Sequence, residues 1–147
     1  MNMTKTTTLS LDELAAEAVR LGRELERAAH AVLLGGNGRD VGHASRTLRR
    51  LAERDPFDPR DDVSLHALEG MVQADLKSEI RGYERRFVET HYDDLGQHGE
   101  VRDFPIYSER GEELLAVQST LVRFMDARSA TLDRIAAERA VLRQLSV

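Results

Sequence analysis

The sequence predicts an all-α fold in which three long helices and one short helix form a bundle, with a C-terminal helix long enough to project from it. Apolar residues recur at alternating spacings of three and four along three long segments, which is the period of an amphipathic helix. Clusters of glycine and proline separate these segments. The chain has 147 residues, of which 41% are hydrophobic, enough for one globular core. We therefore expect a flexible polar tail over residues 1–9 and a single helical-bundle domain over residues 10–147.

The first helix is predicted over residues 11–34. Ser10 and Glu13 form a capping box, in which each side chain bonds to the backbone amide of the other residue. Residues 35–38 read Gly-Gly-Asn-Gly, which ends a helix because glycine adopts the left-handed cap. The apolar stripe keeps a heptad spacing, which is typical of a coiled coil. It consists of Leu11, Leu14, Ala18, Leu21, Leu25, Ala28 and Val32.

A short second helix is predicted over residues 40–54, and two prolines within the next five residues prevent its continuation. A third helix is predicted to begin at a cap formed by Asp61 or Asp62 and to continue to about residue 95. Gly70 lies inside it and costs up to about 1 kcal/mol relative to alanine. The predicted inward stripe consists of Leu65, Leu68, Val72, Leu76, Ile80, Tyr83 and Phe87.

Residues 97–107 form the one segment without a helical pattern. Their apolar residues suit a short extended stretch, which we expect to be too short and too isolated for a sheet. Ser108 then provides a helix cap, followed by glutamates that suit the positive end of a helix. The fourth helix is predicted to reach Leu145, a length of roughly 50 Å.

Arg128 and Arg139 occupy positions on the fourth helix where its stripe calls for apolar residues. A charged side chain on a buried stripe is costly unless it is paired. One interpretation is that this end of the helix is solvated and the arginines extend to water. The alternative is an oligomer interface, in which Arg128 and Arg139 pair with carboxylates of a partner chain.

Composition excludes several classes of protein. The sequence has no cysteine, which rules out disulfides and cysteine-bound metals. The formal net charge is −5, whereas proteins dedicated to duplex nucleic acid usually carry a basic balance. The first ten residues lack the apolar core of a signal peptide, and no apolar run is long enough for a membrane span. We expect a cytoplasmic protein without membrane contact.

A metal site within the bundle is not predicted. Ferritin-like sites need Glu-x-x-His pairs on two helices, and the sequence has none. The nearest candidates are Glu26 with His30 and His66 with Glu69, each spaced to share one helical face. Surface pairs of this kind are common without a metal, so we predict no metal and no cofactor.

Residues 83–92, YERRFVETHY, place Arg86 and His91 five positions apart near the predicted end of the third helix. This spacing resembles the Arg-x4-His motif of the HEPN family of all-helical proteins. The resemblance implies a metal-independent ribonuclease with a composite site at a homodimer interface. There, His91 would shuttle a proton and Arg86 would stabilise charge on the phosphate. The alternative is that Arg86 is a surface charge and His91 a residue favoured by the helix dipole.

A cluster of arginines lies on the outer face of the predicted second helix. It offers contacts to the phosphates of a nucleic acid or to an acidic partner. Alternatively, the aspartates that follow this helix neutralise the arginine charges within the fold. These aspartates are Asp55, Asp58, Asp61 and Asp62. The cluster consists of Arg46, Arg49, Arg50 and Arg54.

Together these observations favour a non-enzymatic helical interaction or assembly protein, either a homo-oligomer or a small subunit of a larger complex. The heptad stripe, the long fourth helix and the lack of a strong catalytic motif support this hypothesis. Two alternatives stay open: a HEPN-like ribonuclease and a nucleic-acid-binding helical subunit. The expected partner is another protein or a second copy of the chain, and nucleic acid is an alternative partner.

Overall fold

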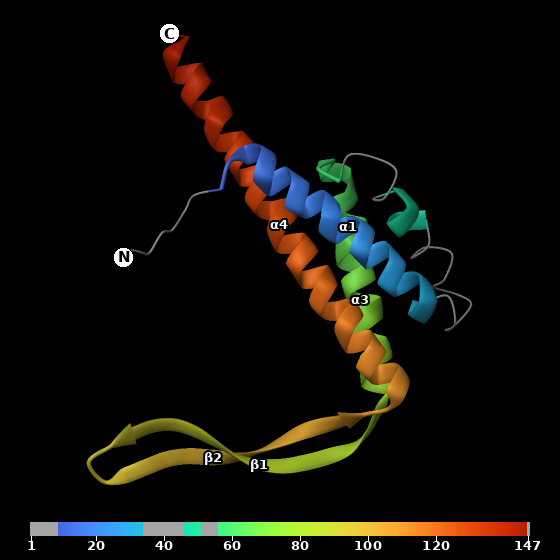
Figure 1. Ribbon diagram of the computed structural model, residues 1–147, viewed down its shortest axis with the longest axis vertical. Coiled ribbons are helices and arrows are strands. Elements are labelled where there is room, and N and C mark those ends of the chain that lie inside the picture. Colours follow the sequence, from blue (N-terminus) through green and yellow to red (C-terminus); the bar gives the residue numbers. More distant parts are fainter. Residues whose placement is uncertain (1–8, 34–45, 51–55, 147) are drawn as a thin grey trace.

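The computed structural model describes residues 9–33, 46–50 and 56–146. Its helical body contains α1 (Leu11–Leu33), α3 (Asp62–Ser78) and α4 (Glu109–Leu145), with the short 3-10 helix η1 (Pro59–Asp61) before α3. Figure 1 shows α1 running alongside α4 in the opposite direction, with α3 lying against the half of α4 nearer its N-terminus. Residues 46–50 are helical, as expected for the second helix. The rest of its predicted range, like most of the N-terminal tail, lies outside the described residues.

The all-α prediction is wrong, because α3 is followed by a two-stranded antiparallel sheet. Strand β1 (Ile80–Asp93) pairs along its length with β2 (Gly96–Tyr107), so the chain has an α+β fold. The third helix ends at Ser78 rather than near residue 95. The segment 97–107 is extended, as predicted, but it forms one strand of a sheet, which contradicts the expectation that it is too short and too isolated for one.

The spacing of apolar residues in β1 explains the error. Tyr83 and Phe87 are four residues apart, and this spacing places two side chains on one face of a helix and also on one face of a strand. The flanking residues favour the strand, since aromatic and β-branched residues such as Val88, Thr90 and Tyr92 fit a pleated surface. No face of the hairpin is buried in the body, so the sequence lacks the regular alternation by which a half-buried strand is recognised.

A tight turn joins the two strands. Asp93 pairs with Gly96, and the amide of Leu95 donates to Asp93 Oδ1 at 2.9 Å, as in an Asx turn. Gly96 has a φ of 114°, a left-handed conformation that only glycine adopts without strain. The sequence Asp-Asp-Leu-Gly therefore reverses the chain here.

The core lies where α1 and α3 meet α4. The predicted stripe of α1 is confirmed, since Ala18, Leu21, Leu25 and Val32 are buried. The largest fully buried side chain is Phe124 of α4. Buried residues from all three helices form one continuous cluster, so the helical body has a single core.

Two predicted helix caps are confirmed. Ser10 and Glu13 exchange reciprocal bonds of 3.2 Å at the start of α1. The Ser108 hydroxyl accepts from the amide of Gly111 at the start of α4. Asp61 stands at the N-cap of α3 but makes no side-chain cap bond, while Asp58 caps the preceding η1.

The fourth helix is unbroken from Glu109 to Leu145, and residues 136–145 are exposed. Figure 1 shows this end of α4 extending beyond the other helices. Within the described part of the chain, none of the helices combines the length and apolar character needed to cross a bilayer.

Candidate functional site

The most distinctive feature of the molecule is its β-hairpin, residues 80–107, which we call the hairpin arm. Figure 1 shows the arm leaving the body where α3 ends and α4 begins, and running away from the helices. Its β1 strand has 14 residues, or about 45 Å at 3.3 Å per residue. An isolated two-stranded hairpin is only marginally stable in water, so an arm of this length needs support.

Support comes first from the junction with the body. The amide of Ser108 donates to the carbonyl of Glu79 and its hydroxyl donates to the Glu79 carboxylate, both at 3.0 Å. Arg110 on α4 forms an ion pair of 2.9 Å with Asp75 on α3. A Cβ on Gly111 would approach Tyr107 Cβ to 2.7 Å, so the first turn of α4 packs closely against the end of β2. These contacts fix the base of the arm on the helices.

One face of the arm carries most of its exposed large apolar side chains. From the register, Tyr83 and Phe87 on β1 share a face with Val101 on β2, and beyond the bulge near residue 90 the same face includes Tyr92. We call these four residues the aromatic face. They are 63%, 58%, 60% and 77% exposed, respectively. The ring of Phe87 lies over Gly99, where an added Cβ would come within 2.7 Å of Phe87 Cζ.

The opposite face carries two histidines. His91 pairs with His98 across the strands, and their rings stack with centroids 4.6 Å apart and an interplanar angle of 12°. His98 Nε2 is 2.9 Å from Asp93 Oδ1 and His91 Nε2 is 3.9 Å from Asp93 Oδ2. We call these three residues the histidine cluster. Its ligand atoms lie within 4.8 Å of one another, so it is the group in the described residues able to hold a metal ion.

The charges of the arm are largely paired within it. Arg85 contacts Asp103, Arg86 contacts Glu84, and Arg102 contacts Glu100. The remaining arginine of the arm, Arg81, pairs with Glu79 at its base. Exposed pairs contribute little to stability, but they leave the arm without a free cationic stripe.

Arg86 and His91 lie in surroundings that differ from those expected. Both are on strand β1 rather than near the end of a helix. They are five residues apart, about 16 Å along an extended strand. The Arg86 guanidinium lies 4.6 Å from the centroid of the Phe104 ring, while His91 stacks on His98. Within one chain, the structure brings each of them to other partners rather than to each other.

The arginines predicted to bind nucleic acid do not share one environment. Arg50 forms a 2.7 Å ion pair with the buried Asp61, so one of the predicted aspartates does neutralise this face. Arg46 and Arg49 are exposed. Arg54 lies outside the described residues.

Arg128 and Arg139, which the sequence analysis considered together as an oligomer interface, lie in different environments on α4. Arg128 is 6% exposed and donates to the carbonyls of Pro56 and Asp58 at 2.7 Å each. It also pairs with Asp62 at 2.6 Å. Its charge is therefore compensated by residues 56–62 of the same chain, at the start of α3. Arg139 is exposed on the projecting end of α4.

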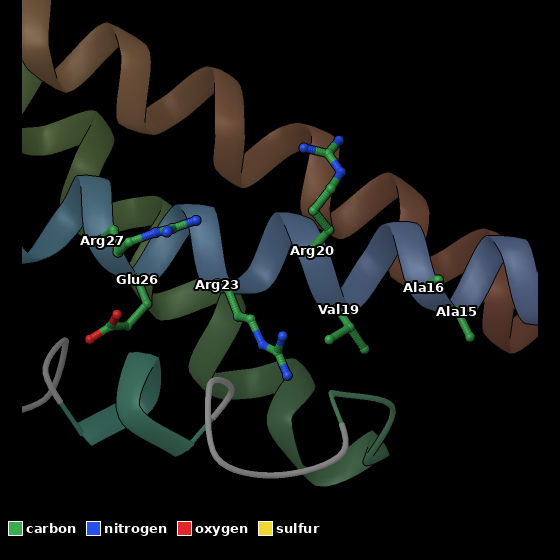
Figure 2. A pocket seen from close by; sticks show the side chains of 7 residues that line it. All are labelled: Ala15, Ala16, Val19, Arg20, Arg23, Glu26 and Arg27. Carbon is green, nitrogen blue, oxygen red and sulfur yellow. The ribbon is translucent and has the colours of Figure 1, made fainter.

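A shallow, open depression runs along α1, lined by Ala15, Ala16, Val19, Arg20, Arg23, Glu26 and Arg27. Figure 2 shows Arg20 and Arg23 pointing to opposite sides of the helix. Arg20 is held by Glu17 and Glu24 at 2.7 and 3.0 Å. The hydrogen bond from Arg20 lowers the pKa of Glu17, and the same bond raises the pKa of Arg20. These side chains do not converge on a ligand.

The two helical histidine pairs considered from the sequence remain minor features. His66 Nδ1 is 3.9 Å from Glu69 Oε1 on the surface of α3. His30 is exposed on α1. Neither pair gains a third ligand among the described residues, in contrast to the histidine cluster.

No model of a known protein family, no curated protein and no solved structure matches this chain.

The aromatic face and the histidine cluster are the features that reasoning from sequence missed. Tyr83 and Phe87 were assigned to a buried helical stripe, yet both are exposed. His91 and His98 are seven residues apart, and this spacing predicts a metal site only when a turn between them pairs the two strands. The turn signal Asp-Asp-Leu-Gly at residues 93–96 is the feature that would have shown this.

Proposed function

We propose that this chain is a non-enzymatic assembly protein that associates with a second copy of itself through the aromatic face of the hairpin arm. The observation that carries the proposal is the exposure of Tyr83, Phe87, Tyr92 and Val101 on one face of an arm that extends from the body. The Arg85–Asp103 pair lies on the same face between Tyr83 and Phe87, so the apolar residues alternate with polar ones. An exposed group of large apolar residues with polar neighbours marks a protein interaction site. Aromatic residues of this kind supply most of the energy of such contacts.

The arm also presents two open edges. Each strand of a two-stranded sheet leaves a row of backbone amides and carbonyls without a partner in the sheet. A second arm added at an edge would satisfy these groups, and one packed on the aromatic face would cover the apolar side chains. Either arrangement supplies the support that a long hairpin needs.

A protein partner suits the arm better than nucleic acid. Residues 80–107 contain four arginines and six acidic residues, and each arginine is ion-paired. Phosphate binding depends on an excess of basic groups along the contact, whereas the arm has an excess of acidic ones. A second copy is the partner we favour, because a twofold axis places identical apolar faces and identical edges opposite each other.

Sedimentation velocity over a concentration series of about 1–100 µM tests the proposal. We expect reversible association of the native chain, with the double variant Tyr83→Ser/Tyr92→Ser raising the dissociation constant about tenfold or more. Neither tyrosine packs in the core, so the variant should keep the helical circular dichroism of the native chain.

The matched control is Val63→Ser, which removes a 79% exposed apolar side chain from α3. It should leave association unchanged. A native chain that stays monomeric throughout the series would contradict the proposal. So would association that persists in the tyrosine variant but is lost in Leu142→Ser, since Leu142 lies on the projecting end of α4.

A further inference from the structure

We infer that the histidine cluster at the far end of the hairpin arm, His91, Asp93 and His98, binds a divalent transition-metal ion such as Zn²⁺. Two imidazole nitrogens and one carboxylate oxygen are a common ligand set for such ions, and imidazole disfavours Mg²⁺ and Ca²⁺. The site is separate from the aromatic face, so this inference does not rest on self-association.

The separations between ligand atoms suit a small tetrahedral ion. Bonds of about 2.0–2.1 Å in a tetrahedral site place neighbouring ligand atoms about 3.4 Å apart. His98 Nε2 and Asp93 Oδ1 are 2.9 Å apart, and His91 Nε2 and Asp93 Oδ2 are 3.9 Å apart. The two distances lie on either side of the required value. The two distances reach different oxygens of the carboxylate, so each histidine already lies within reach of an ion held by Asp93. A metal lies in the plane of each imidazole it binds, so the two stacked rings must rotate out of their stack for both Nε2 atoms to face one ion. Both side chains are exposed, which leaves room for this rotation.

Surrounding hydrogen bonds select the correct nitrogen of His91. The hydroxyl of Thr90 lies 3.2 Å from the carbonyl of His98 and 3.2 Å from Nδ1 of His91. If its one proton goes to the carbonyl, which can only accept, the hydroxyl accepts from Nδ1–H of His91. That assignment leaves the Nε2 lone pair, on the side of Asp93, free for a metal. The threonine thus has the role of the outer partner found beside metal-binding histidines.

Asp93 is also held in place by its surroundings. The amide of Leu95 donates to Asp93 Oδ1 at 2.9 Å, which fixes the carboxylate within the turn. In the absence of metal, Nε2–H of His98 bonds to the same oxygen. Metal binding replaces that proton, as it does at other histidine ligands.

The local charge favours a cation. Residues 87–101 contain no lysine or arginine and four acidic residues, Glu89, Asp93, Asp94 and Glu100. Glu100 is paired with Arg102, so the other three supply the negative charge near the site. The side chains of His91, Asp93 and His98 are 60%, 48% and 39% exposed, so the remaining coordination positions are open to water. The site is therefore predicted to be exchangeable rather than closed and structural.

Calorimetric titration of the full chain with Zn²⁺ alone, at a pH where imidazole is neutral, tests the inference. We expect one Zn²⁺ per chain, with affinity reduced about tenfold or more in His91→Gln and in His98→Gln. His66→Gln is the matched control, because His66 is also an exposed histidine beside a carboxylate. It should leave the affinity unchanged.

Nitrogen-15 NMR of the histidine side chains gives the second readout. Zn²⁺ should shift Nε2 of His91 and leave Nδ1 protonated. Absence of binding, coordination through Nδ1, or equal losses in His66→Gln and His98→Gln would overturn the inference. The double variant Tyr83→Ser/Tyr92→Ser should bind Zn²⁺ like the native chain, so a failure of self-association and a failure of metal binding are distinguishable.

Discussion

Replacement of Arg128 by methionine should destabilise the helical body strongly. The guanidinium donates to two backbone carbonyls, those of Pro56 and Asp58, and these bonds join α4 to a segment about 70 residues earlier in the chain. Methionine keeps the apolar stem but donates nothing, so both carbonyls lose their charged donor. A group left without its partner in a buried site costs about 1–3 kcal/mol.

The magnitude follows from the burial of each partner. Asp62 is 54% exposed, so its pair with Arg128 is largely screened by water and adds little. The bond to Pro56 is buried and the bond to Asp58 is only partly buried, so the second carbonyl can regain water when the guanidinium is removed. The expected loss in the free energy of unfolding is therefore about 2–4 kcal/mol. For a domain of this size, that corresponds to a fall in Tm of roughly 5–12 °C. Arg128→Lys keeps the charge but not the fork of donors, and we expect about half of the loss.

Urea unfolding followed by far-ultraviolet circular dichroism measures these differences. Arg139→Met is the control, because Arg139 is exposed on the projecting end of α4 and should change stability by less than about 0.5 kcal/mol. Equal stabilities for the Arg128 and Arg139 variants, within that margin, would refute the reasoning.

Three further predictions concern the arm, α3 and η1. Gly99→Ala should disrupt the arm and leave the unfolding of the body unchanged, because the new Cβ would lie 2.1 Å from the carbonyl oxygen of Val88. Amide NMR shifts confined to residues 80–107 would show this effect, and an arm spectrum like that of the native chain would contradict it. Gly70→Ala should instead stabilise α3 by about 0.5–1 kcal/mol in urea unfolding, because the added Cβ meets nothing within 4 Å, and a loss of stability would count against the described packing. The pKa of Asp58 is lowered from 3.8 to about 2, mainly by the side-chain hydrogen bond from Arg60. The ionised carboxylate therefore stabilises η1 above about pH 4, and this stabilisation is lost as the pH falls towards 2. NMR titration of the Asp58 carboxyl should show this midpoint in the native chain and a higher one in Arg60→Gln, and a native midpoint near 3.8 would rule the interaction out.

The helical body could be predicted from the sequence because its elements are amphipathic and capped. The apolar stripe of α1 identifies residues that are buried in the core. Ser10 and Ser108 mark the starts of two helices, because each accepts a hydrogen bond from a nearby backbone amide. These signals act within a few residues of one another. They do not depend on where other parts of the chain lie.

The hairpin arm could not be predicted in the same way because it has no buried face. A strand is recognised by the alternation that burial of one side imposes, and both sides of this arm meet solvent. The spacing of Tyr83 and Phe87 fits a helix equally well. The position of Arg128 shows a related limit, since sequence identified a charge on a buried stripe but not the carbonyls of Pro56 and Asp58 that bind it.

The histidine cluster depends on pairing across strands. His91, Asp93 and His98 come together through the turn at residues 93–96 and the register that follows from it. A search restricted to helical spacings of three and four does not reach such a group. The Arg-x4-His spacing was visible in the sequence, but its two residues belong to a strand rather than a helix.

Hydrogen–deuterium exchange of the native chain at low and high protein concentration tests self-association through the arm most directly. We expect exchange of amides in residues 80–107 to slow markedly as concentration rises, while amides in the cores of α1, α3 and α4 exchange at the same rates. The slowing should be absent in Tyr83→Ser/Tyr92→Ser. Exchange of the arm that does not depend on concentration, or protection that appears at the C-terminal end of α4 instead, would contradict the proposal that the arm is the assembly surface.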